Sequence, residues 1–367
     1  MPQPDPTGPI FEVYYQFCVS LQSCRNGPLG AERERRGVGP HRNVGVLSFR
    51  GPIQILKSGH SLSPGMEVAW RLGALFALLS VGVGARRVGV LDERRTAWLT
   101  GTAFYVALPA LIFTATYDRD LAALVSPALV VGVVLVIATT ALVGWVVHRR
   151  RRTTGRRSVA LVQSYHSNLG FLGVPLVALT LGPAATAVAS VVLGVAALVQ
   201  VPMTILVLVA MNDADAAVRD ELGELATNPV LWALVAGLAG ALVELSIPGR
   251  LDAGLGLLGQ TALPLALLGV GASLQFDATE FDVGATGSVV ALKVAVMPAL
   301  AWAVFSLLAV SGTAFGAVVL LFGMPSAVST YVYASELGGD ARFASINVFV
   351  TTVASLATVG VVLQLVG

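Results

Sequence analysis

The feature that most constrains this chain is a series of long apolar segments that carry almost no charge. Residues 121–147 contain no charged side chain and residues 227–248 contain only Glu244, and each segment is longer than the ~20 apolar residues that cross a bilayer. In the whole chain 55% of residues are hydrophobic and 12% are charged, which leaves too little polar surface for a soluble globule. The pattern therefore predicts an all-α polytopic membrane protein and not a soluble enzyme.

Apolar runs bounded by charged or Gly/Pro-rich turns predict ten transmembrane helices. The expected spans are 67–85, 96–116, 124–147, 158–181, 184–210, 229–247, 257–275, 285–311, 313–336 and 343–366. Helices are the expected form because an open strand would leave backbone N–H and C=O groups unpaired in hydrocarbon.

Residues 1–65 differ from the rest of the chain and predict a disordered N-terminal extension. They contain scattered Pro and Gly, a run of charges at 32–36 and no sustained apolar segment. Both cysteines, Cys18 and Cys24, lie there, so no disulfide, metal site or cofactor is expected in the membrane part. Met66 directly precedes the first span, and we hypothesise that translation begins there. An intact native mass that includes residues 1–65 would refute this.

Basic residues predict the orientation of the chain in the cell (plasma) membrane. They crowd the first connection (86–95) and the third (149–157), which should therefore be cytoplasmic. Both termini are then extracytoplasmic, and a cytoplasmic loop at 212–228 divides the membrane part into residues 66–211 and 229–367.

Two sequence landmarks recur at nearly one spacing and predict an internal repeat. Ala107-Leu108-Pro109 recurs as Ala262-Leu263-Pro264, 155 residues later, and Leu181-Gly182 recurs as Leu337-Gly338, 156 residues later. Five spans per half would make the repeats inverted, as in secondary transporters. The alternative is chance, because these residue types are abundant here.

The fourth span combines polar residues with helix breakers at mid-membrane depth. A polar stretch from Gln163 to Asn168 is followed by Gly170, Gly173 and Pro175. Backbone groups freed by such breakers must line a protein-enclosed cavity or bind a substrate. The ninth span has a similar break, with Gly323 and Pro325 followed by hydroxyl side chains. Half-helix N-termini that face each other there would favour a carboxylate.

Two titratable residues in the spans each leave two alternatives open. His166 is a hydrogen-bonded packing residue or a proton-linked switch. Lys293 has a functional charge inside the eighth span, or its side chain extends to the membrane surface. The absence of a GxxxxGK[ST] motif argues against an ATP-driven pump, and the absence of paired carboxylates in the spans argues against a Na⁺/H⁺ antiporter.

Landmarks spread from Met66 to the C-terminus resemble those of the auxin efflux carrier family, prokaryotic branch. They are Gly89-Val90-Leu91, Ala107 to Leu111, Asn168 to Pro175, Asn228-Pro229, Leu263-Pro264 through Leu274, and Met324-Pro325. The resemblance implies ten helices in two inverted five-helix repeats, with broken fourth and ninth helices that cross at the substrate site. It also implies export or exchange of small organic anions, and a homodimer.

The resemblance assigns the family's fourth-helix Asn to Asn168 and its crossover prolines to Pro175 and Pro325. The ninth-helix Asn of plant members is not matched, because Ser329 and Thr330 occupy that neighbourhood. This departure argues against auxin as substrate, and prokaryotic relatives suggest dicarboxylates such as malate or malonate.

The sequence is therefore interpreted as a secondary transporter that moves small carboxylates outward by alternating access. The expected substrate-binding residues are Asn168, Gly173, Val174, Pro175, Pro325, Ser326, Ser329 and Thr330, with His166 and Lys293 as coupling or charge candidates. The expected partners are the organic anion and the lipid bilayer, and no nucleic acid. The alternatives are a Na⁺- or H⁺-coupled organic anion symporter and a non-transporting membrane sensor.

Overall fold

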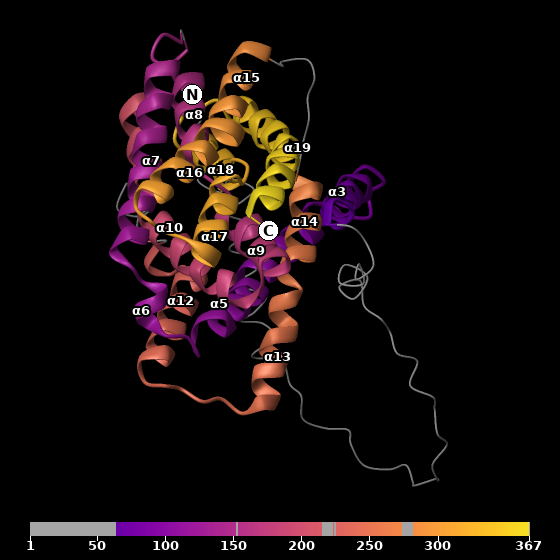
Figure 1. Cartoon of the computed structure of the whole chain (residues 1–367). Coiled ribbons are helices and arrows are strands. Elements are labelled where there is room, and N and C mark those ends of the chain that lie inside the picture. The colour runs from indigo at the N-terminus through magenta and orange to yellow at the C-terminus, as the bar shows by residue number, and fades with distance from the viewer. Residues whose placement is uncertain (1–63, 152, 215–222, 224, 274–281, 367) are drawn as a thin grey trace, which may run out of the picture.

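The computed structural model describes residues 64–151, 153–214, 223, 225–273 and 282–366 (Figure 1). Almost all of the predicted N-terminal extension, and most of the loop at 212–228, lie outside these residues. The described part is helical, and its only β-type pairing is one isolated bridge.

The helices of the first part of the chain begin before Met66. They are α3 (Pro64–Arg87), α4 (Glu93–Thr102), η1 (Ala103–Ala107), α5 (Leu108–Thr116), α6 (Leu121–Leu124), α7 (Pro127–His148), α8 (Thr154–Tyr165), η2 (Leu169–Gly173), α9 (Val174–Thr180) and α10 (Gly182–Asn212). The elements named η are single π-helical turns. η1 and η4 lie within longer helices, and η2 begins the helix that continues as α9.

The second part of the chain contains a comparable set of helices. They are α12 (Pro229–Leu242), α13 (Gly249–Gln260), α14 (Ala262–Ser273), α15 (Val283–Ala291), η4 (Leu292–Val296), α16 (Met297–Leu307), α17 (Gly312–Phe322), α18 (Ser329–Glu336) and α19 (Ala341–Val366).

Six helices in the described residues are long and apolar enough to cross a membrane. They cover Glu93–Thr116, Pro127–His148, Gly182–Asn212, Gly249–Ser273, Val283–Leu307 and Ala341–Val366, and shorter apolar helices cover Leu169–Thr180, Pro229–Leu242 and Gly312–Phe322. These helices confirm the prediction of an all-helical polytopic membrane protein.

Some predicted span boundaries were wrong by several residues. The segment predicted to end at 247 ends at Leu242, because a turn with Glu244 at φ 50° follows it. The segment predicted to start at 257 starts at Gly249, directly after Pro248. Proline favours such a helix start because its fixed φ suits the entry to the first turn. Counting apolar residues does not detect these turns.

Each of the three π-helical turns lies directly before an X-Pro pair. η1 precedes Pro109, η2 precedes Pro175 and η4 precedes Pro298. Proline has no N–H, and its ring crowds the carbonyl one turn earlier, so a wider turn relieves the clash. These prolines therefore widen the helices where they occur without stopping them.

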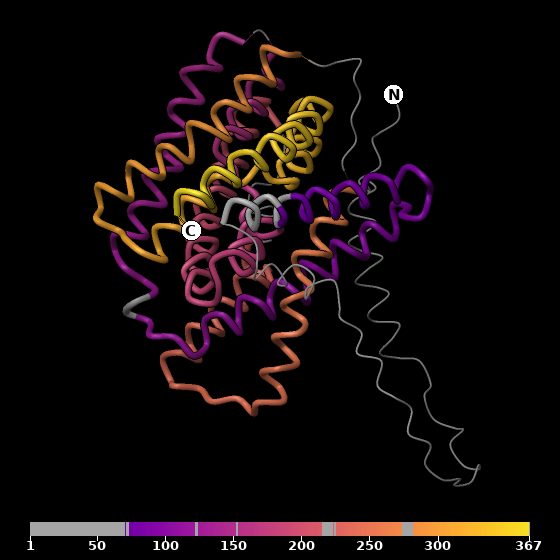
Figure 2. Tube along the Cα trace, turned by 45° about the vertical axis from the view of Figure 1, so that its right-hand side comes forward, coloured from indigo at the N-terminus to yellow at the C-terminus, as the bar shows by residue number. Residues whose placement is uncertain are grey.

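The helices pack as two groups, which we name the panel and the crossing bundle. The panel consists of α3, α4–α5, α12 and α13–α14, with α14 packed on α3 and α4, and with α12 and α13 packed on α5. The crossing bundle consists of α7, α8–α9, α10, α15–α16, α17–α18 and α19. Figure 1 shows α13 and α14 along one side of the molecule and α7 on the other. In Figure 2 the indigo α3 again projects from the panel side.

Candidate functional site

Two interrupted helices of the crossing bundle meet at their breaks. Helix α8 ends at Tyr165 and helix resumes at Leu169, whereas α17 ends at Phe322 and helix resumes at Ser329. The backbone N–H of Asn168 donates to the carbonyl of Pro325 (2.9 Å), and that of Ala327 donates to the carbonyl of His166 (3.1 Å). This antiparallel bridge satisfies backbone groups that the breaks release, as an apolar environment requires.

Helix α10 holds the first break from behind. Gln200 accepts a hydrogen bond from the backbone N–H of Ser167 through Oε1 (2.6 Å). The Thr204 hydroxyl lies 2.8 Å from Nδ1 of His166 and 3.2 Å from the Tyr165 hydroxyl. His166 is buried and bonded to a neutral hydroxyl, as a packing residue would be, and its role in proton coupling stays a prediction. Gln200 and Thr204 were not among the predicted site residues.

Asn168 combines a structural backbone with an unused side-chain donor. Its carbonyl accepts a hydrogen bond from Gly173 N–H (3.1 Å), which starts the resumed helix. The side chain is buried, and its Nδ2 has no hydrogen-bond partner among the described residues. Buried polar groups are nearly always paired in proteins, so a free amide donor at this place is typical of a site that binds a ligand.

Lys293 is the only buried lysine among the described residues, and its side chain lies at the same break. It lies in the π-helical turn η4 and its side chain has no exposed surface, so it does not extend to the membrane surface. Its Nζ donates to Ser167 Oγ (2.5 Å) and contacts Met297 Sδ (2.9 Å). Both contacts are neutral groups, and no ion pair of Lys293 occurs among the described residues.

A buried amide network supports the second break. Gln163 donates through Nε2 to Thr330 Oγ1 and to the carbonyl of Ala344, and its Oε1 accepts from Asn347 Nδ2, each at 2.9 Å. Ser326 donates through Oγ to the Gln163 carbonyl (2.8 Å). Asn347 was missed by the sequence reasoning, although an Asn inside an apolar helix is a recognisable signal.

The predicted site residues divide into two sets. Asn168, Ser326 and Thr330 lie at the breaks and make the contacts described above, and Pro325 accepts the bridge hydrogen bond. Gly173, Val174 and Pro175 are buried but offer no side-chain polar group. A Cβ on Gly173 would meet Leu321 and Met324, so this glycine packs α9 against α17. Ser329 is half-buried at the start of α18.

A cavity separates the second break from the panel. Pro325 and Met324 line it on the bundle side, together with Thr352 and Ser355 of α19. The panel contributes leucines of α3 and α14 to its opposite wall, namely Leu75, Leu79, Leu263 and Leu267. Asn168 and Lys293 do not line it. The face of the panel next to the site is therefore apolar.

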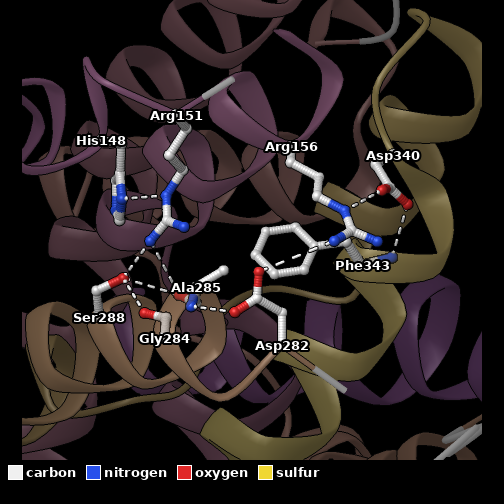
Figure 3. Close-up of polar contacts among 9 residues, drawn as sticks. All are labelled: His148, Arg151, Arg156, Asp282, Gly284, Ala285, Ser288, Asp340 and Phe343. Carbon is white, nitrogen blue, oxygen red and sulfur yellow. Dashed lines mark hydrogen bonds and ion pairs between the residues drawn. The ribbon is translucent and has the colours of Figure 1, made fainter. Parts of the chain in front are cut away.

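An ionic cluster joins segments at the end of the bundle where α7 leads into α8 (Figure 3). Arg156 donates to Asp340 Oδ2 (2.8 Å), lies 3.9 Å from Asp282 Oδ2 and stacks over the Phe343 ring at 5.8 Å. It thus links α8 to the starts of α15 and α19. Because these side chains are partly exposed, each pair contributes at most about 1 kcal/mol.

Arg151 makes a second link at this end of the bundle. It donates to His148 Nδ1 (3.0 Å) and to Ser288 Oγ (2.6 Å), and Nε2 of His148 lies 3.1 Å from Ser164 Oγ (Figure 3). Partial burial lowers the pKa of the Arg151 guanidinium, opposed by the charge of Asp282, which raises it. Arginine nevertheless stays charged in proteins, so Arg151 remains a donor in both hydrogen bonds.

The described residues contain no group of His, Cys, Asp and Glu that could hold a metal ion. Helices long and apolar enough to span a membrane, two interrupted helices that meet at their breaks, and a buried amide donor without a partner among the described residues are typical of a membrane transporter. This is the class of protein to which the molecule belongs.

The comparison with known sequences gives the family. The family described as "Membrane transport protein" matches residues 71–224 and 219–363, and the chain belongs to this family, the auxin efflux carrier family. This confirms the resemblance drawn from the sequence landmarks.

Two relatives cover most of the chain. An "Uncharacterized transporter" of Methanothermobacter thermautotrophicus is 28% identical over 296 residues, which are 78% of this chain and 94% of the relative. A "Putative malonate transporter" of Rhizobium meliloti is 25% identical over 313 residues, which are 82% of this chain and 96% of the relative.

Proposed function

We propose that this protein is a secondary transporter that moves small organic anions across the cytoplasmic membrane by alternating access, in the outward direction. The observation that carries the proposal is the buried Lys293 ammonium, whose polar contacts among the described residues are Ser167 Oγ and Met297 Sδ. A buried charge is expensive unless a partner neutralises it. A carboxylate bound at the break would supply that partner.

The neighbouring groups suit a carboxylate. Asn168 Nδ2 is an unused donor beside the same break, and carboxylates accept hydrogen bonds through both oxygens. The half-helices that resume at Leu169 and Ser329 direct their positive ends toward the crossing. In this proposal Asn168, the backbone near Gly173, and the segment from Pro325 to Thr330 surround the anion, while Lys293 binds its charge.

The proposed architecture is two inverted five-helix repeats, residues 66–211 and 229–367, joined by a cytoplasmic loop at 212–228. Ten helices then cross the membrane and both termini are extracytoplasmic. The panel and the crossing bundle would move against each other to expose the site to each side in turn. The membrane potential favours anion exit by roughly 2.3 kcal/mol per charge per 100 mV.

Malonate is the first substrate to test, because one relative is named a "Putative malonate transporter". Its two carboxylates would use the Lys293 ammonium and the Asn168 amide separately or together. The substrate class proposed is therefore small mono- and dicarboxylates.

Counterflow in proteoliposomes tests the proposal. Labelled malonate, malate and indole-3-acetate are offered to vesicles loaded with the same unlabelled compound, with wild type, Asn168→Ala and the control Ser335→Ala. Ser335 is exposed and bonds only within its own helix, to the Val332 carbonyl.

We expect counterflow of at least one anion. Asn168→Ala should reduce it by about 10-fold or more, since a hydrogen bond to a charged group contributes about 1.5–3 kcal/mol. Ser335→Ala should transport like wild type. Absence of flux for all three anions, with folded protein, would refute the proposal for these substrates.

A further inference from the structure

A carrier with the proposed function, on which this inference rests, must return after it has released its substrate. The surroundings of Lys293 bear on that return step. Lys293 is fully buried in the crossing bundle, and its ammonium contacts only a hydroxyl and a thioether. In the state described by the structure, this charge is therefore solvated by two neutral groups and has no counter-ion among the described residues.

The interior of the described part of the molecule contains no acidic side chain that could serve as a counter-ion for Lys293. Its buried polar and charged side chains are Thr, Ser, Asn, Gln and His besides Lys293. None of them is Asp or Glu. The ion pairs of Arg156 with Asp340 and Asp282 are partly exposed at the end of the bundle, far along α8 from the break. No side chain of the described interior can pair with the Lys293 ammonium, so a counter-ion for it would have to be bound from outside the chain.

The surface past which the break would move is apolar. Across the cavity from Pro325 the panel presents leucines of α3 and α14, such as Leu75 and Leu267. Lys293 lies behind the break and does not line this cavity itself. A break that carries a net charge past such a surface finds no polar group on the panel, and keeping a charge in a low-dielectric environment costs several kcal/mol after relaxation. An ammonium paired with a carboxylate avoids most of that penalty.

From these observations we propose that the carrier is an obligatory anion exchanger. The unpaired Lys293 ammonium prevents the empty bundle from changing its orientation, whereas a bound carboxylate neutralises the charge and permits the change in either direction. Each organic anion that leaves must then be replaced by a second carboxylate anion that enters. A multiply charged anion that leaves in exchange for a singly charged one still follows the membrane potential.

Wild-type proteoliposomes test the exchange directly. Vesicles that contain the full chain are loaded with labelled malonate at saturating concentration, and the membrane voltage is held at zero with equal K⁺ on both sides and valinomycin. Efflux of label is measured into buffer without substrate and into buffer with unlabelled malonate, malate or indole-3-acetate.

We expect efflux to be at least about 10-fold faster when a transported anion is present outside, which corresponds to about 1.4 kcal/mol. Equal rates with and without external anion would overturn the exchange mechanism and leave the transporter proposal intact. No efflux under either condition with any of the three anions inside would contradict the proposed function as well. The two failures are therefore distinguishable.

Substitutions of Lys293 test whether its charge is the cause. Lys293→Met removes the charge at similar length, and Lys293→Arg keeps it as the matched control. In K293M the ratio of exchange to net efflux should fall to about one, whereas K293R should keep a high ratio. The ratio is taken within one preparation, so the amount of folded protein cancels.

A ratio in K293M as high as in wild type would overturn the role of Lys293. Loss of both fluxes in folded K293M would overturn that role too, because the proposal requires the uncharged bundle to reorient.

Discussion

The panel and the crossing bundle solve the same problem, how to pack helices in a membrane, by different means. Of the 22 buried polar or charged side chains in the described part of the chain, only Thr96 and Thr116 lie in the panel. Both panel hydroxyls bond to carbonyls of their own helices, at Asp92 and Ile112. The bundle joins its helices by buried side-chain bonds across long sequence separations, such as Gln163 to Asn347. The comparable panel bond, from the Tyr117 hydroxyl to Asp252, is only partly buried.

Close approach of backbones holds the panel together. A Cβ on Gly82 of α3 would meet the backbone of α14 at Leu268, and a Cβ on Gly271 of α14 would meet the backbone of α3 at Leu79. Between α13 and α5, a Cβ on Gly259 would meet the backbone of Leu111 at 2.9 Å. Small residues that let helices touch are the usual means of packing in lipid, where no hydrophobic force drives association.

This difference indicates that the panel is a framework and that the crossing bundle contains the candidate site. The panel relies mainly on van der Waals contact, and its buried hydroxyls are satisfied within their own helices. The bundle concentrates polar groups at the breaks and satisfies most of them internally. Asn168 Nδ2 and Asn347 Oδ1 have no partner among the described residues, and the Lys293 charge has no counter-ion there. Three predictions test this contrast, from the largest expected effect to the smallest.

Gln163→Leu should destabilise the protein by about 3 kcal/mol, because three buried groups on α18 and α19 lose their partner at once. Thermal unfolding of purified protein in detergent measures the change. The matched panel variant is Thr116→Val, whose hydroxyl bonds only within its own helix, and it should cost less than about 1 kcal/mol. Equal losses of stability in the two variants would contradict the difference between the polar bundle and the apolar panel.

Gly82→Ala should destabilise by about 2 kcal/mol, because its methyl group would press on α14 backbone that cannot move unless the helices separate. Gly84→Ala on the same helix is the control, since nothing lies within 4 Å of a Cβ there. It should be neutral, or stabilising by up to about 1 kcal/mol through helix propensity. If both variants lowered the melting temperature by a similar amount, close backbone packing of α3 on α14 would be contradicted.

Lys293→Met should raise thermal stability by about 1 kcal/mol, even though it damages transport, because replacing an uncompensated buried charge by an apolar side chain removes a desolvation penalty. Lys293→Arg retains the charge and should not stabilise. Melting is compared without added anion and with malonate. A lower melting temperature of K293M in the absence of anion would show that the charge already has a partner within the chain.

Much of the helical arrangement could be predicted from the sequence because its causes are local. Apolar length identifies membrane helices, and Pro325 and the polar run before Asn168 mark the breaks. Gln200, Thr204 and Asn347 could not be assigned in this way. Each contributes to the site through a partner 33 to 184 residues away, and local pattern contains no information about which helices pack together.

The sequence by itself determined that this chain is a helical membrane protein with breaks in two helices, since lipid leaves backbone and charge few alternatives. It placed Lys293 inside a span but left open whether its side chain reaches the membrane surface. Only the tertiary structure decided that the ammonium lies against Ser167 at the crossing, without an anion among the described residues. Whether a charge is solvated, paired or left for a substrate depends on which side chains from distant helices surround it.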